Sequence, residues 1–147
     1  MELRYLYLGS ADTQRDVAAW SAVPGAVVRW RFRHFGADVA AVDLGAPPVL
    51  LIADHRPAGS VLPIYAVADL DAAVDGMAAH GWTVVVRSMG TPEGLAAVVR
   101  DASGVEVALL AVERPGAMDQ AYAAADNTHA VRPAGGTRTG PDPTIGP

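Results

Sequence analysis

The sequence repeats one order of predicted elements after 57 residues, and this repetition limits the fold more than any other feature. Asp12 and Asp69 each stand where a side chain can cap the N-terminus of a helix. The same separation places the apolar run Leu50–Ile52 on Val107–Leu109. Because one offset aligns helix caps and strands without a gap, the sequence predicts two copies of one supersecondary unit.

Each copy is predicted to contain a strand, a helix and three further strands. In the first copy, alternating side chains in Leu3–Leu8 and Val27–His34 indicate strands, and Pro24-Gly25 ends the helix between them. The remaining predicted strands lie at 39–44 and 49–53 in the first copy, and at 61–67, 83–89, 95–100 and 106–112 in the second, with a helix between Asp69 and Gly81. The predicted fold class is α+β, with two tandem βαβββ units.

The predicted boundaries follow from this repeat. Residues 1–57 form the first unit and residues 58–114 the second, together one domain, and residues 115–147 form a C-terminal tail. Residues 118–125 of the tail can form a short helix, and the rest is rich in Gly, Pro and Thr without periodicity. We expect this rest to be flexible. The alternative is an arm that packs over a partner subunit or over the mouth of a pocket.

Composition excludes several classes of chemistry. The chain has 147 residues, 51% of them hydrophobic, enough for one packed domain. It has no Cys, and all 11 of its basic residues are Arg, which excludes disulfides, thiolate zinc sites and lysine Schiff bases. A net charge of −5 argues against nucleic acid and anionic membranes as partners. The N-terminal segment lacks a leader pattern, so we expect a cytoplasmic protein that does not insert into a membrane.

Three phrases carry a resemblance to a known family. Ala66–Val74 resembles the strand-to-helix phrase of the vicinal oxygen chelate superfamily, which includes glyoxalase I, bleomycin-resistance proteins and extradiol dioxygenases. His80-Gly81-Trp82 resembles the helix end of that family. Asp101–Val107 is similar to its turn before the last strand, although Ala102 and Val105 replace the Pro and Asn of the family pattern. The resemblance covers about residues 3 to 113.

The resemblance implies that each unit curls into a half-barrel and that the two half-barrels enclose a cavity. Members commonly form homodimers, and the enzymes hold a divalent metal with His and Glu from the first and last strands of both units. The corresponding positions here are Tyr5, Leu51, Leu62 and Ala108. Leu and Ala offer no donor atom, and one Tyr is a poor anchor for a divalent ion. We therefore expect no metal and no cofactor, unless a metal is recruited through other ligands.

Other residues are candidates for binding a small organic molecule. Aromatic side chains can line a pocket for a flat ligand, or they can be ordinary core. His34 and His55 are candidates for a pocket rim, and Glu106 is either a pocket acid or an edge carboxylate. The complete candidate set for ligand binding is Tyr5, Tyr7, Trp30, Phe32, His34, Leu51, His55, Leu62, Glu106 and Ala108. No catalytic residue is assigned.

Three arginines alternate along one predicted strand, at Arg29, Arg31 and Arg33. Such a row is typical of a solvated face on which the aliphatic stems cover apolar neighbours. If that face is concave, the row favours an acidic or phosphorylated ligand instead.

The favoured function is metal-independent binding of a hydrophobic or aromatic small molecule, similar to the bleomycin-resistance branch, in a cavity formed by a homodimer. The alternative is an enzyme on the same scaffold, a lyase, isomerase or cyclase, with Tyr5, His34, His55 or Glu106 as general acid or base. A third possibility is a regulatory subunit whose cavity is filled by its own side chains.

Overall fold

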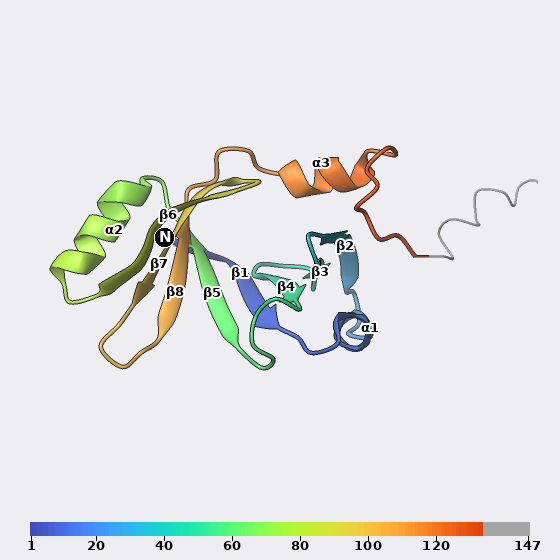
Figure 1. The fold of residues 1–147 in the computed structure, drawn as a ribbon, viewed down its shortest axis with the longest axis horizontal. Coiled ribbons are helices and arrows are strands. Elements are labelled where there is room, and N and C mark those ends of the chain that lie inside the picture. Colours follow the sequence, from blue (N-terminus) through green and yellow to red (C-terminus); the bar gives the residue numbers. More distant parts are fainter. Residues whose placement is uncertain (134–147) are drawn as a thin grey trace, which may run out of the picture.

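The computed structural model describes residues 1–133 and shows the predicted repeat of elements (Figure 1). The first unit contains β1 (Glu2–Gly9), α1 (Thr13–Ser21), β2 (Val27–His34), β3 (Ala37–Asp43) and β4 (Val49–Ala53). The second contains β5 (Val61–Ala66), α2 (Leu70–Ala79), β6 (Thr83–Thr91), β7 (Gly94–Arg100) and β8 (Glu106–Leu110), and α3 (Ala117–Ala123) follows. Strands β7 and β8 begin and end 57 positions after β3 and β4. The predicted α+β class is confirmed.

All eight strands form one curled sheet in the order β2-β3-β4-β1-β5-β8-β7-β6. Strands β1 and β5 pair antiparallel at the centre, and each pairs in parallel with the last strand of its own unit. The other neighbours are antiparallel. Figure 1 shows the two halves on either side of β1 and β5. The predicted boundary between the units lies in the connector from β4 to β5.

Both long helices begin at the predicted caps. The Asp12 carboxylate accepts a hydrogen bond from the backbone N–H of Arg15 at 3.0 Å. The Asp69 carboxylate accepts the equivalent bond from Ala72, also at 3.0 Å. Each bond satisfies a backbone donor that the first turn of a helix leaves without a partner, which is why the chain becomes helical at these two positions.

The two long helices cover the outer face of the sheet (Figure 1). Val17 of α1 packs in a buried cluster with Val42 and Ile52. Val74 of α2 packs in a second cluster with Leu109. Because side chains alternate along a strand, packing of one face against helices turns the neighbouring side chains toward the concave face. The concave face is therefore lined by a separate set of residues.

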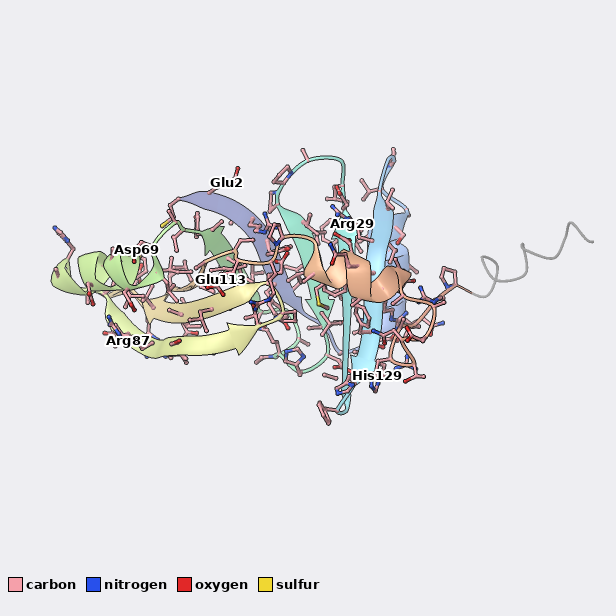
Figure 2. The ribbon with its side chains drawn as sticks, turned by 90° about the horizontal axis from the view of Figure 1, so that it is seen from above. Glu2, Arg29, Asp69, Arg87, Glu113 and His129 are labelled. Carbon is pink, nitrogen blue, oxygen red and sulfur yellow. The ribbon has the colours of Figure 1, made fainter. Side chains whose placement is uncertain are left out.

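The described part of the C-terminal tail packs on its own chain. Met118 and Tyr122 of α3 contact the apolar cluster around Trp30 on the concave side of the first half. Figure 2 shows α3 lying over the strands of this half, with Arg29 beside it. Residues 129–131 run along the edge of β2 and exchange two backbone hydrogen bonds with it. The expectation of a flexible tail falls in part on residues 134–147, which lie outside the described residues.

The arginines of β2 are paired with carboxylates. Asp38, at the start of β3, is 5% exposed and accepts hydrogen bonds from Arg31 at 2.7 and 2.9 Å, Arg33 at 3.1 Å and the Thr13 hydroxyl at 3.0 Å. Arg29 pairs with Asp43 and with Asp119 of α3. The bonds from Arg31 are the main reason that the pKa of Asp38 lies at about 2, below its ordinary value of 3.8. The three arginines of β2 thus form ion pairs that link β2 to β3 and to α3.

We expect Asp38→Asn to lower the free energy of unfolding by about 2–3 kcal/mol at pH 7, because it leaves Arg31 without its charged partner. Because the folded pKa lies below the unfolded one, the stabilisation is complete above pH 4 and is lost as the pH falls toward 2. Urea unfolding at several pH values measures both effects.

Asp75→Asn is the matched control, because its ion pair with Arg87 is exposed to solvent. We expect it to cost less than about 1 kcal/mol. Equal losses in the two variants would contradict the importance of the Asp38 network.

Candidate functional site

A cavity of about 460 Å³ lies on the concave face of the sheet and is lined by both halves of the chain. Tyr5 and Tyr7 face it from β1, and Leu62 and Ile64 face it from β5. In each pair the residues lie two positions apart, so their side chains share one face of the strand. Further lining comes from β2, β3, β4, β7, β8, the turn after β6 and Met118 of α3. The cavity is formed within one chain, whereas a homodimer was expected to form it.

Nine of the ten predicted binding residues lie on the lining of this cavity. They are Tyr5, Tyr7, Trp30, Phe32, His34, Leu51, His55, Leu62 and Ala108. Glu106 lies outside it, because the register of β8 places it opposite Arg100 at the end of the strand pair, where the two side chains form an ion pair at 2.6 Å. Ligand binding by the nine residues stays a prediction.

Aromatic rings form the wall of the first half. Trp30 is 7% exposed, and its ring lies 5.7 Å from that of Phe32 between centroids. Tyr122 of α3 packs edge-on against Phe32 at 5.8 Å. At the end of the strand the ring of His34 meets that of His129, with centroids 3.7 Å apart. Helix α3 and the segment after it therefore pack against this wall on the concave side.

The four positions at which the resemblance implied metal ligands all lie on the lining. Tyr5, Leu51, Leu62 and Ala108 supply one oxygen donor in total. Within residues 1–133, no group of three or more His, Cys, Asp or Glu side chains is arranged to hold a metal ion. A divalent ion needs three or four such donors, so this donor set does not fit one.

A buried carboxylate, which the sequence analysis did not single out, stands at one end of the cavity. Glu93, in the turn between β6 and β7, is 7% exposed. The Tyr5 hydroxyl donates a hydrogen bond of 2.6 Å to its Oε1, and Arg4 Nη2 donates one of 3.3 Å to its Oε2. The backbone carbonyl of Glu93 accepts bonds from the N–H groups of Glu113 and Arg114. Glu93 is thus fixed through both its side chain and its backbone.

This arrangement keeps the Tyr5 phenol protonated. Burial, followed by the hydrogen bond to Glu93 and the charge of that carboxylate, raises the pKa of Tyr5 to about 12. The Tyr5 phenol is therefore the donor of this hydrogen bond and Glu93 the acceptor. No sequence signal predicted the pair, because 88 positions separate its members and an acidic residue in a hairpin turn is ordinarily solvated.

A glycine allows the Glu93 turn to approach the sheet. The backbone at Gly94 has a φ of 153°, and a Cβ there would collide with the carbonyl oxygen of Ala111. Only Gly fits such a close contact. This Gly after an acidic residue in a turn is the one feature that could have indicated a tightly packed turn.

Three polar groups stand at the other end of the cavity. The Tyr7 hydroxyl lies 2.9 Å from His55 Nε2, and the two rings meet edge to face. The Arg56 guanidinium lies over the Tyr7 ring, 5.6 Å from its centroid. Burial raises the pKa of Tyr7, and the charge of Arg56 opposes this shift.

The connector that carries His55 and Arg56 is held against the end of β1. The N–H of Gly9 donates to the carbonyl of Ser60 at 2.9 Å, and the N–H of Gly59 donates to the carbonyl of Gly9 at 3.1 Å. A Cβ at Gly9 would collide with the carbonyl oxygen of Pro57. The absent side chain thus places the connector, and with it Arg56, beside the cavity.

A second cavity of about 340 Å³ adjoins the first, and its lining is more polar. Tyr5, Trp30, Glu93 and Met118 line both cavities and form the wall between them. Arg4, Arg29, Asp43 and Asp119 contribute charged groups to the smaller cavity. These four are paired with one another or with Glu93.

Comparisons with known proteins identify the fold. No family model matches the chain, and no curated protein matches its sequence. Among solved structures, a hypothetical protein from Bacillus halodurans is 8% identical, with a TM-score of 0.65, and the match covers 77% of this chain and 95% of that one. Methylmalonyl-CoA epimerase from Mycobacterium tuberculosis is 16% identical, with a TM-score of 0.65 and coverage of 77% and 89%. The chain has the vicinal oxygen chelate fold.

A third match agrees with this. The Streptomyces coelicolor methylmalonyl-CoA epimerase, in complex with 2-nitronate-propionyl-CoA, is 15% identical, with a TM-score of 0.62 and coverage of 78% and 99%. At these identities the likeness concerns the fold alone. Among residues 1–133, no helix is long and apolar enough to cross a membrane.

Tyr5→Phe and Tyr7→Phe form a matched pair, because each removes one hydroxyl from the same face of β1. We expect Tyr5→Phe to lower the free energy of unfolding by about 1–3 kcal/mol, since the buried Glu93 loses a donor. We expect Tyr7→Phe to cost less than about 1 kcal/mol, because the exposed His55 can bond to water instead. Urea unfolding at pH 7 measures both, and equal costs would contradict the structural role of the Tyr5–Glu93 bond.

Proposed function

We propose that the protein binds a hydrophobic or aromatic small molecule in the larger cavity, without a metal ion, as a sequestration or resistance-type protein. One observation carries the proposal: an apolar cavity of about 460 Å³, walled by aromatic rings on one side, that spans both halves of the sheet. Cavities that bind small ligands have this character, with a few polar groups among apolar walls.

The physical basis of affinity is burial. A flat apolar ligand gains roughly 25 cal/mol for each Å² that it removes from water. Contact with the rings of Trp30 and Phe32 adds offset or edge-to-face stacking. Polar groups at the ends of the cavity orient the ligand. Sequestration requires affinity and exclusion of water, and it needs no reacting group.

One observation favours an enzyme as the second candidate. The Tyr5–Glu93 pair places a carboxylate acceptor and a phenol donor 2.6 Å apart on the lining of the cavity. In a lyase, isomerase or cyclase, Glu93 would accept a proton and Tyr5 would donate one. Turnover of a bound compound that is lost in Glu93→Gln, with binding retained, would favour this function over sequestration.

The neutral fluorescent probe N-phenyl-1-naphthylamine tests the proposed function, because its emission rises when it leaves water. We expect saturable binding at one probe per chain. We expect Ala108→Phe to weaken it at least about tenfold, because the new ring occupies the floor of the cavity. Fluorescence titration gives both values.

Ala102→Phe is the control, because Ala102 lies in an exposed turn and we expect no change in probe affinity. Circular dichroism checks that each variant is folded. If Ala108→Phe does not fold, Ala96→Leu replaces it in the test. Ala96 lies on the adjacent strand β7 and lines the same cavity, and Leu is a smaller insertion than Phe. Absence of saturable binding to the unaltered protein would contradict the proposal.

We further propose that the chain acts as a cytoplasmic homodimer. Strand β6 is an edge of the sheet, and its Val85 and Met89 are 39% and 40% exposed. An apolar edge strand is typical of a surface that pairs with another chain. We expect sedimentation equilibrium to show a dimer and Val85→Arg to shift it toward monomer. A monomer at all concentrations would contradict this expectation.

A further inference from the structure

Arg56 differs from every other arginine in residues 1–133. Each of the others donates to a carboxylate or to a backbone carbonyl, whereas Arg56 has neither an ion pair nor a hydrogen bond, and its contact is with the face of the Tyr7 ring. The paired arginines are Arg4, Arg15, Arg29, Arg31, Arg33, Arg87, Arg100, Arg114 and Arg132. Within the described residues, no carboxylate or carbonyl therefore accepts a hydrogen bond from the Arg56 guanidinium.

The unpaired state of Arg56 carries a cost. Its Nε is buried and has no hydrogen-bond partner. Arg4 Nε is in the same state, but Arg4 also donates through Nη2 to Glu93, whereas Arg56 donates to no acceptor in the described residues. A guanidinium remains charged at all ordinary pH values, so it cannot escape this cost by losing a proton. Buried N–H groups in native proteins are almost always satisfied, so an exception needs an explanation. For a charged group on the lining of a cavity, an acceptor on a bound ligand is one such explanation.

The position of Arg56 indicates where that acceptor comes from. Arg56 lines the larger cavity beside His55 and the Tyr7 hydroxyl. The lining contains one carboxylate, Glu93, and this is already engaged by Tyr5 and Arg4. Asp54, the nearest acid in sequence, accepts from the backbone N–H of Asp38 on β3. No acidic side chain of the lining is thus available to Arg56.

We propose that the ligand of the larger cavity is a flat apolar organic acid whose single carboxylate is bound by Arg56. This inference rests on the proposed function and adds the chemical class of the ligand. The planar guanidinium presents paired N–H donors that match a carboxylate. The apolar body of the ligand lies against Trp30, Phe32 and the aliphatic side chains of the second half.

The charge of the lining sets the charge of the ligand. Arg56 is the one arginine on it, so it balances one negative charge. A nucleotide or a polyphosphate carries several negative charges and needs several cations or a row of backbone N–H groups. The site therefore favours a monoanion with a large apolar body over a phosphorylated ligand.

Two probes of the same shape test this inference, 2-naphthoate and its neutral amide, 2-naphthamide. We expect the unaltered protein to bind the acid at least about tenfold more tightly than the amide, because a charged acceptor gives the stronger hydrogen bond to Arg56. Arg56→Met keeps an unbranched apolar side chain and removes the charge. We expect it to abolish this preference, with a larger loss of affinity for the acid than for the amide, as measured by isothermal titration calorimetry.

Arg87→Met is the matched control, because it removes one positive charge from the surface away from the cavity, and it should retain the preference. Arg56→Lys should retain part of it. Equal affinity of the unaltered protein for acid and amide would overturn the inference, and so would an equal loss of both in Arg56→Met. In those two cases binding of N-phenyl-1-naphthylamine would leave the proposed function standing. Failure of all three probes to bind would overturn the proposed function itself.

Discussion

Strands β1 and β5 lie side by side at the centre of the sheet, and their antiparallel pairing joins two four-stranded halves into one surface (Figure 1). The register sets Tyr7 opposite Leu62 and Tyr5 opposite Ile64, so all four side chains face the same side. Because the period of a strand is two, a slip of one residue would turn the tyrosines of β1 toward α1. The cavity exists because this one register is kept.

The two halves share a backbone plan and differ in what they present to the cavity. In the strand pairing, Val86 and Met89 of β6 take the places that Trp30 and Phe32 take on β2, so the aromatic wall belongs to the first half alone. Helix α3 covers this wall, and the second half has no equivalent helix among residues 1–133. The hairpin turns differ in the same way, since Phe35 is 97% exposed whereas Glu93 is buried.

Two charged groups of the cavity lie in segments between strands. Glu93 comes from a turn and Arg56 from the connector between the units, and in both cases a glycine lets backbone approach backbone closely. At one end, the Glu93 carboxylate accepts hydrogen bonds from Tyr5 and Arg4. At the other end, the Arg56 guanidinium has no hydrogen-bond acceptor in the described residues. A cavity with this polarity favours a ligand whose negative charge meets Arg56 and whose apolar part fills the middle. The function that we propose follows from this asymmetry.

The sequence by itself determined the elements and their order, but not the face of every strand residue. A register shift between Val28 and Trp30 places Val28 against the α1 cluster and Trp30 on the concave side, where strict alternation would put both on one face. Helix caps, alternation and the 57-residue repeat are local or periodic signals. Together with the positions that the family resemblance implied, they selected ten candidate residues, of which nine lie on one lining and remain predicted binding residues. Only the tertiary structure decided that Glu93 meets Tyr5, that α3 covers Trp30, that Glu106 is held by Arg100 and that Arg56 has no partner. Each of these depends on which side chains meet across the curled sheet. That is set by the path of turns and connectors rather than by the pattern within any one strand.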